Sequence, residues 1–368
     1  MIMASCKIKE IKDLGQSIWL DYFDRKIMDS GQLKRLIEST GITGITSNPS
    51  IFQKAIENDV DYYEDIRLQS QHQKNNEVIF FSLAIQDIKR AADLFIHVYE
   101  KSSGKEGLVS IEVSPRIAYN TNETIKQARE LWSLIDRRNV MIKIPATLEG
   151  LPAIRTCISE GININVTLLF GLPRYRQVAE AYISGLEDRI KLNKPVNEIV
   201  SVASFFLSRI DVLTDPLLED RRLLDLKGEV AIASAKMAYW IYKTIYEGER
   251  FGKLELNGAK RQQLLWASTS SKDPSFSDVK YVEELIGKGT IHTLPLETIE
   301  AFNDHGLAVS HLEDNMEKAT AVLAQLDTRG IDINMITQKL EDDGIKKFNK
   351  SYNDLLETIE NKKNVQMT

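Results

Sequence analysis

The chain has 368 residues, of which 43% are hydrophobic and 27% charged, and this composition excludes a disordered or collagen-like protein. Its 47 Lys and Arg residues against 53 Asp and Glu residues give a net charge of -6, which argues against a dedicated nucleic-acid binder. The two cysteines, Cys6 and Cys157, lie in no C-x-x-C pattern, so neither a disulfide framework nor a zinc ribbon is expected.

Residues 1–10 lack the apolar core of a signal peptide. The longest apolar stretches, near residues 78–85 and 199–207, are far shorter than the ~20 residues that span a bilayer. We therefore expect a cytoplasmic protein that has neither a membrane nor a nucleic acid as its partner.

Short apolar runs rich in β-branched residues alternate along the chain with longer helical patterns. The runs predicted as strands are residues 18–21, 44–47, 108–112, 140–144, 162–167, 200–204, 263–267 and 290–294. Predicted helices between them include residues 31–39, 121–138, 150–160, 173–190, 229–247 and 278–286. This alternation predicts right-handed βαβ crossovers, and eight buried parallel strands are the number that closes a (β/α)8 TIM barrel of the α/β class.

No Pro/Gly/Ser-rich linker divides the chain, so one domain over residues 1–368 is expected. The connection around residues 53–99 is about twice the usual length, and residues 296–368 are predicted as a helical C-terminal extension packed on the barrel. One amphipathic stripe in this extension contains Ile345, Phe348, Tyr352, Leu355, Leu356 and Ile359. Either the helix packs on the outside of the barrel, or it also covers the mouth of an active site.

Common cofactor and metal motifs are absent from the sequence. There is no Walker A run and no G-x-S-x-G elbow, and Gly287 and Gly289 lack the third glycine of a dinucleotide fingerprint. The five histidines show no H-E-x-x-H spacing. We therefore predict chemistry that uses polar side chains, with no metal and no cofactor.

Polar side chains stand at or just past the ends of four predicted strands: Asp21, Asn48, Glu112 and Lys143. In a (β/α)8 barrel the carboxyl ends of all strands converge on the face that carries catalytic groups. Burying a charge costs several kcal/mol unless it is paired, so these residues need a reason to be there.

Lys143 lies within the apolar run of residues 140–145. Period-two alternation puts Met141 and Lys143 on one face and Ile142 and Ile144 on the other, so Lys143 points into the barrel if the isoleucines pack against helices. An apolar surrounding disfavours the charged ammonium form, and a neutral amine can attack a carbonyl to form a Schiff base. The alternative is a buried salt bridge from Lys143 to Glu112 or Asp21.

Schiff-base chemistry needs two proton-transfer groups. One serves the dehydration of the carbinolamine, and the other removes a proton from the hydroxyl at the bond that breaks. Asp21 and Glu112 supply such a pair, although helix capping or pairing with a nearby base would also explain each.

Read together, the strand ends resemble the transaldolase family of class I Schiff-base aldolases over nearly the whole chain, and the late segments resemble its longer, bacterial-type subfamily. The matching stretches are TSNPS (46–50), VSIEV (109–113), IKIPAT (142–147), GININVTLLF (161–170), SFFLSRI (204–210), LWAST (265–269), TLP (293–295) and DHG (304–306). The resemblance implies a transferase with a cofactor-free ping-pong reaction in the non-oxidative pentose phosphate pathway. A dihydroxyacetone unit moves from sedoheptulose 7-phosphate to glyceraldehyde 3-phosphate, giving erythrose 4-phosphate and fructose 6-phosphate.

The resemblance also implies roles for the residues that match the family's catalytic positions. Lys143 matches the Schiff-base lysine, and Asp21 matches the acid/base at the substrate's C4 hydroxyl. Glu112 matches the carboxylate that works through a water held by Thr167, and Asn48 matches the amide that binds substrate hydroxyls.

Ser204 and Arg209 match phosphate contacts, although Arg209 could instead form a salt bridge with Asp211. Many family members have a second phosphate-binding Arg after the seventh strand, where this chain has residues 267–274 without an arginine. Lys272 or Ser270 is expected to replace it.

Glu112 and Phe206 favour transfer to an acceptor over simple cleavage, because the related fructose-6-phosphate aldolases generally place other groups at these positions. A free-standing aldolase of that kind stays an alternative, as does a non-catalytic barrel that binds sugar phosphates. The small-molecule partners are sugar phosphates in either case, and the oligomeric state is expected to be monomer or homodimer.

Overall fold

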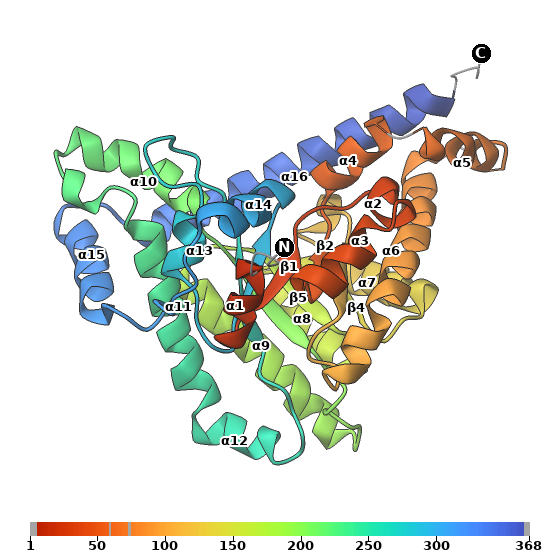
Figure 1. The fold of residues 1–368 in the computed structure, drawn as a ribbon. Coiled ribbons are helices and arrows are strands. Elements are labelled where there is room, and N and C mark those ends of the chain that lie inside the picture. Colours follow the sequence, from red (N-terminus) through yellow and green to blue (C-terminus); the bar gives the residue numbers. More distant parts are fainter. Residues whose placement is uncertain (1–5, 59, 73–74, 364–368) are drawn as a thin grey trace.

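The computed structural model describes residues 6–58, 60–72 and 75–363. Eight parallel strands follow one another around a closed barrel in chain order, and the last pairs with the first (Figure 1). The strands are β1 (Ser17–Leu20), β2 (Gly44–Thr46), β3 (Leu108–Glu112), β4 (Val140–Pro145), β5 (Ile164–Leu169), β6 (Ser201–Phe206), β7 (Gln263–Ala267) and β8 (Ile291–Leu294). Each overlaps a predicted strand, so the predicted α/β barrel is confirmed.

Helices surround the barrel and cover its strands. They are α1 (Lys7–Asp13), α2 (Arg25–Asp29), α3 (Gln32–Arg35), α4 (Pro49–Asn58), α5 (Asp61–Ser70), α6 (Asn76–Lys101), α7 (Thr121–Ile135), α8 (Gly150–Glu160), α9 (Leu172–Lys191), α10 (Ser208–Asp220), α11 (Val230–Tyr246), α12 (Glu249–Glu255), α13 (Lys280–Glu284), α14 (Leu296–His305), α15 (Met316–Thr328) and α16 (Ile333–Lys363). Because the helices bury the outer faces of the strands, every residue of β3, β4, β5 and β6 is buried.

The predicted helix over residues 31–39 is interrupted. It consists of the short α3 followed by a π-helical turn, Leu36–Thr40. The hydroxyl of Thr40 donates to the carbonyl of Leu36 at 2.5 Å, and the hydroxyl of Ser39 donates to the carbonyl of Arg35. Such back-bonding by Ser and Thr competes with regular helical geometry, which explains the change of helix type.

The long connection between β2 and β3 holds three helices, α4, α5 and α6, where one is usual. The longest of these, α6, has 26 residues and ends near the start of β3. The prediction that this connection is unusually long is therefore confirmed.

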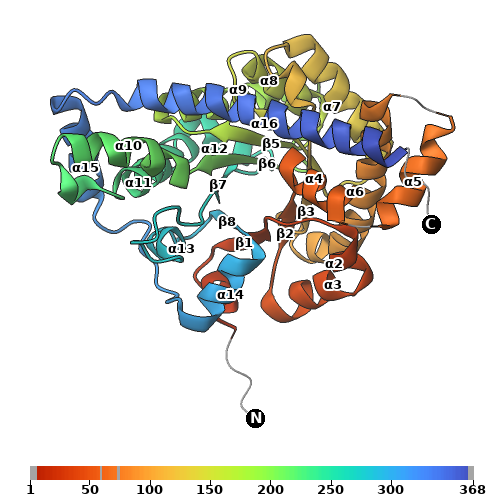
Figure 2. The ribbon, with the colours of Figure 1, turned by 90° about the horizontal axis from the view of Figure 1, so that it is seen from above.

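The last helix, α16, is 31 residues long and crosses the molecule on the side seen in Figure 2. Its buried stripe includes Ile345, Phe348, Tyr352, Leu355 and Ile359, in agreement with the predicted amphipathic pattern. It contacts α4, α5 and α6 along one part of its length and α10 along another.

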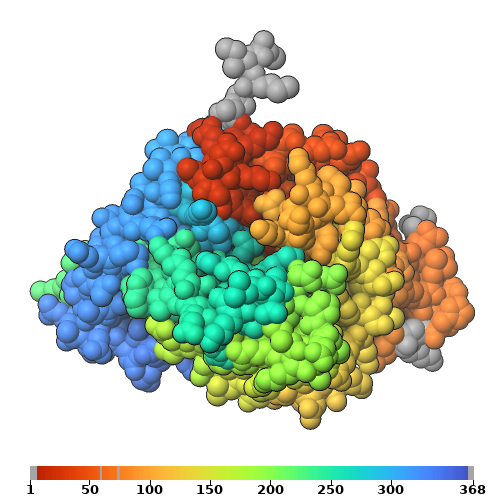
Figure 3. Space-filling view, turned by 90° about the horizontal axis from the view of Figure 1, so that it is seen from below, coloured from red at the N-terminus to blue at the C-terminus, as the bar shows by residue number. Residues whose placement is uncertain are grey.

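The end of the barrel at which the strands begin is formed by the segments that precede the strands. In Figure 3 the red N-terminal segment, the orange and yellow segments and the green and teal segments meet on this face, and the dark blue of α16 does not cross its centre. Among the described residues, no helix is long and apolar enough to cross a membrane.

Candidate active site

Lys143 and Glu112 lie side by side on adjacent strands inside the barrel. The register of β3 and β4 places the two residues opposite one another, and Lys143 Nζ is 3.6 Å from Glu112 Oε2. Both side chains are almost fully buried, at 6% and 4% exposure. Lys143 Nζ also donates a hydrogen bond to the carbonyl of Ser47, at 3.0 Å, so three strand ends hold the amine in place.

This geometry includes the buried ion pair that was the structural alternative for Lys143. The pair does not exclude a nucleophilic role, because Lys143 also lines an internal cavity of about 220 Å³. Glu112 places a carboxylate beside that amine.

The two carboxylates are both held in surroundings that favour their protonated forms. Burial raises the pKa of Glu112 to about 7, and the nearby Lys143 ammonium opposes part of that rise. Burial also raises the pKa of Asp21, again against the attraction of Lys143. The Glu112 carboxyl, with its pKa at about 7, can exchange protons near neutral pH, as general acid/base catalysis requires.

Thr167 lies on β5, the strand beside the one that carries Lys143, and it is fully buried. Its hydroxyl oxygen and both carboxylate oxygens of Glu112 have no hydrogen-bond partner among the described residues. Buried polar atoms are normally satisfied, so these atoms retain capacity for a substrate hydroxyl or a bridging water. The next residue, Leu168, has a left-handed backbone (φ 55°), and the pairing of β5 with β6 shifts register between Val166 and Leu169. An irregularity of this kind at a strand end re-aims the side chains beside it.

The cavity brings most of the predicted site residues together. Its walls include Asp21, Asn48, Lys143, Thr167, Ser204, Phe206, Arg209 and Lys272. Glu112 is the one predicted residue outside this wall, and it reaches the site through its ion pair with Lys143.

Asn48 and Ser204 both use part of their hydrogen-bonding capacity within the protein. Asn48 Oδ1 accepts from the N–H of Ile51 at 3.0 Å, which caps the start of α4 and leaves the amide nitrogen for a substrate hydroxyl. The hydroxyl of Ser204 donates to Asn165 Oδ1 at 2.7 Å. A hydroxyl that donates its proton elsewhere is a poor phosphate ligand, so this bond gives the predicted phosphate role of Ser204 no support.

Arg209 lies in the cavity wall with its guanidinium carbon 5.6 Å from the centre of the Phe206 ring. It forms no hydrogen bond or ion pair within the described part of the chain. The alternative salt bridge to Asp211 does not form, because Asp211 accepts from the N–H of Ala231 at 2.8 Å and from the hydroxyl of Tyr281 at 2.7 Å. Burial lowers the pKa of Arg209.

Lys272 is the second cation in the wall, and its ammonium donates to the Ser270 hydroxyl at 2.5 Å. Burial lowers the pKa of Lys272, and the charges of Arg209 and Lys347 lower it further. Both residues that were predicted to replace the missing arginine therefore lie at the cavity, joined to one another.

The arrangement can be compared with known proteins. A family model described as transaldolase/fructose-6-phosphate aldolase matches residues 18–359. The chain belongs to this family.

Several relatives named transaldolase match this chain over almost its full length. One from Trichodesmium erythraeum is 46% identical over 373 residues, which cover 98% of each chain. One from Thiobacillus denitrificans is 42% identical over 354 residues, 95% of this chain and 99% of the relative. One from Saccharopolyspora erythraea is 41% identical, with 97% of each chain covered. The resemblance inferred from the strand-end motifs is thereby confirmed.

Some residues of this transaldolase-family site were not named from the sequence, although a C-terminal helix over the mouth of an active site was one of the two alternatives for the extension. Asn165 pairs in register with Lys143, and its amide donates to the Ser110 hydroxyl at 3.0 Å while accepting from Ser204. Its signal was an amide in the middle of an apolar strand. Lys347 and Phe348 of α16 also line the cavity, so the extension reaches the mouth of the site.

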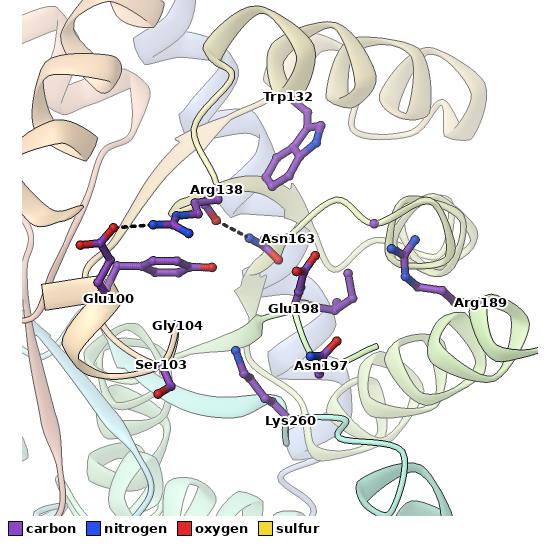
Figure 4. A pocket seen from close by; sticks show the side chains of 13 residues that line it. Glu100, Ser103, Gly104, Trp132, Arg138, Asn163, Arg189, Asn197, Glu198 and Lys260 are labelled. Carbon is purple, nitrogen blue, oxygen red and sulfur yellow. Dashed lines mark hydrogen bonds and ion pairs between the residues drawn. The ribbon is translucent and has the colours of Figure 1, made fainter. Parts of the chain in front are cut away.

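A second cavity, of about 440 Å³, lies at the ends where the strands begin (Figure 4). Its side chains come mainly from loops, and Arg138 there pairs with Glu100 at 2.5 Å while its carbonyl accepts from Asn163. No group of three or more His, Cys, Asp or Glu side chains that could hold a metal ion occurs in the described ranges. Lys143 and Asp21 line the first cavity, and Glu112 pairs with Lys143, so that cavity is the candidate active site.

Proposed function

We propose that this chain is a transaldolase, in which Lys143 forms the Schiff base. The observation that carries the proposal is a buried lysine amine 3.6 Å from Glu112, in a cavity whose wall also contains Asp21. Full-length relatives named transaldolase, at 41–46% identity, support the same assignment.

In the proposed reaction the Lys143 amine attacks the C2 carbonyl of the ketose phosphate. Glu112 takes the proton from the amine. A water held by Glu112 and Thr167 then delivers that proton to the C2 oxygen, which leaves the carbinolamine as water while the imine forms. Asp21 then removes the proton from the C4 hydroxyl, the C3–C4 bond breaks, and the aldose leaves. The three-carbon enamine stays on Lys143 until it attacks the acceptor aldehyde.

The proposed donor and acceptor are sedoheptulose 7-phosphate and glyceraldehyde 3-phosphate, with the reverse pair of fructose 6-phosphate and erythrose 4-phosphate. The polar, partly cationic wall of the cavity suits hydroxylated, phosphorylated chains of this size. Arg209 and Lys272 are the proposed phosphate ligands, since a planar guanidinium binds two phosphate oxygens at once. A cytoplasmic location stays a prediction.

Borohydride reduction in the presence of fructose 6-phosphate tests the covalent step, because it converts an imine into a stable secondary amine. We expect peptide mass mapping to find the adduct on Lys143 alone. Lys236 is a matched control, because it is also buried and lies 3.5 Å from a carboxylate oxygen of Glu284. Lys236→Met is expected to keep the adduct, Lys143→Met is expected to lose it, and absence of an adduct from the wild-type protein would support the non-catalytic alternative.

A coupled assay with and without erythrose 4-phosphate separates transfer from simple cleavage. Turnover of fructose 6-phosphate that depends on the acceptor supports a transaldolase. Equal turnover without the acceptor would identify an aldolase that releases dihydroxyacetone.

A further inference from the structure

Hydrogen bonds to several other elements hold helix α16 over the mouth of the active site. The hydroxyls of Ser50 and Ser351 are 2.8 Å apart, and Ser50 itself lines the cavity. The hydroxyl of Tyr352 donates to Glu77 Oε1 at 2.7 Å, and the amide of Asn349 donates to the carbonyl of Pro115 at 3.2 Å. Figure 2 shows the helix as a strap that passes from the α4 and α5 side to the α10 side.

At Gly344 the backbone of α16 packs against Leu168 and lies near Arg209. A Cβ atom at this position would lie 3.1 Å from Leu168 Cδ2 and 3.8 Å from Arg209 Nη1. The absence of a side chain thus lets the helix pack closely against Leu168, and this packing places the helix in van der Waals range of Arg209. Lys347 follows three residues later, so it projects from nearly the same face of the helix.

Lys347 has an acidic residue within reach on its own helix and does not pair with it. Asp343, one turn earlier, accepts ion pairs from Lys339 at 2.6 Å and from Lys346 at 3.6 Å. Lys347 forms no ion pair with any described residue, and it is one of the residues that line the cavity that contains Lys143.

Three cations therefore gather at one end of the active-site cavity: Arg209 from α10, Lys272 from the loop after β7 and Lys347 from α16. Like charges in a partly desolvated site repel one another, and the charge of Lys347 acts on Lys272 strongly enough to lower its pKa. The carboxylates that act on Lys272 in the opposite sense are Glu297 and Asp21, and neither forms an ion pair with it. A bound dianion would relieve this repulsion.

We propose that Lys347 is a phosphate ligand of the substrate, and that Arg209, Lys272 and Lys347 form a three-cation clamp closed by the C-terminal helix. This inference rests on the proposed function, because it takes a phosphorylated sugar as the occupant. It assigns to α16 a direct part in substrate binding and accounts for the loop after β7, which has no arginine.

Lys347→Met and Lys346→Met form a matched pair for the test. The two lysines are neighbours on the exposed side of the same helix, and only Lys347 lines the cavity. Three quantities would be measured for each variant: the KM for fructose 6-phosphate, the inhibition constant of inorganic phosphate, and the yield of borohydride adduct with unphosphorylated dihydroxyacetone.

For Lys347→Met we expect the KM and the phosphate inhibition constant each to rise about tenfold, which is the lower range for loss of a charged hydrogen bond. The dihydroxyacetone adduct should form as in the wild-type protein, since that compound carries no phosphate. Lys346→Met should leave all three quantities within about twofold.

Unchanged KM and phosphate inhibition in Lys347→Met would overturn the inference. Equal losses with dihydroxyacetone and with fructose 6-phosphate would also overturn it, because they would show a structural role for the side chain. If the wild-type protein forms no adduct at all, the proposed function fails. Calorimetric titration of inorganic phosphate into the wild-type protein and both variants then still decides whether Lys347 binds the anion.

Discussion

The Lys143–Glu112 pair makes a quantitative prediction about stability at alkaline pH. Lys143→Met removes the cation that, among the described residues, lowers the pKa of Glu112. For unit charges 3.6 Å apart, an effective dielectric constant of about 20 gives an attraction of roughly 5 kcal/mol, taken as an upper bound. The loss of this attraction raises the pKa of Glu112 well above 7, so the buried carboxyl stays protonated at neutral pH in the variant.

The sign of the effect on stability follows from proton binding. Glu112 in the unfolded chain titrates near its ordinary value of 4.5 and is ionised above pH 7. The native variant still holds the proton there, so its stability falls as pH rises, by about 1.4 kcal/mol per pH unit for one proton. In the wild-type protein Glu112 is half ionised at about pH 7 and largely ionised about one pH unit higher, so its contribution to the pH dependence levels off there.

Urea unfolding followed by tryptophan fluorescence at pH 7, 8 and 9 measures this difference. Between pH 7 and 9 we expect Lys143→Met to lose about 2–3 kcal/mol more than the wild-type protein. The double variant Lys143→Met/Glu112→Gln has no carboxyl at position 112 and should lose less stability over this range than Lys143→Met. Any loss that remains beyond that of the wild type is assigned to Asp21, whose pKa Lys143 also lowers. Parallel pH profiles for Lys143→Met and the wild-type protein would refute the argument, because they would show that Lys143 does not control the protonation of Glu112.

Three further substitutions test individual residues of the site. Thr167→Val keeps the volume of the side chain but removes a buried hydroxyl that has no partner among the described residues. We therefore expect the free energy of unfolding to be unchanged or higher by up to about 1 kcal/mol, and kcat to be lower by about tenfold or more. Full retention of kcat would argue against a water-holding role for Thr167. In the wild-type protein kcat should rise with pH through about 7 as Glu112 ionises and becomes able to accept a proton, and Glu112→Gln should remove this step; a step that persists in the variant belongs to another group. Arg209→Met should weaken the binding of fructose 6-phosphate by about 1.5–3 kcal/mol and leave unphosphorylated fructose unaffected, whereas equal effects on both sugars would reject the phosphate role.

The barrel was predictable because its signals are local. Each strand is a short apolar run between polar, helix-forming segments, and a closed parallel sheet leaves such runs no other place to be buried. Lys143 and Glu112 were predictable for the same reason, since a charge inside an apolar strand is conspicuous. Their separation of 3.6 Å depends on the register of β3 and β4, which no local pattern encodes.

Lys347 and the bonding of Ser204 could not be predicted because they depend on contacts between distant parts of the chain. Lys346, Lys347 and Lys350 look alike in a charged helix, and only the rotation of α16 over the barrel decides which of them reaches the cavity. The hydroxyl of Ser204 had no evident partner in its own strand, and it took one from β5 in the folded barrel. The π-helical turn at Leu36–Thr40 likewise reflects side-chain hydroxyls that override helical propensity.

The bonds that fasten α16 also bear on the order in which the chain folds. Ser50 and Ser351 are 301 positions apart, and Glu77 and Tyr352 are 275 apart. Closing a loop of this length costs chain entropy before the new contact can stabilise the chain, so such contacts form late in folding. Closure of the barrel between β1 and β8 joins Ser17 to Ile291, 274 positions apart, so barrel closure and the docking of α16 are both expected after the local helices and strands have formed. Until α16 docks, the apolar stripe of the helix is open to solvent and to other chains. Recovery of sugar-phosphate binding should lag behind recovery of secondary structure, and the lag should be most vulnerable to aggregation at high protein concentration.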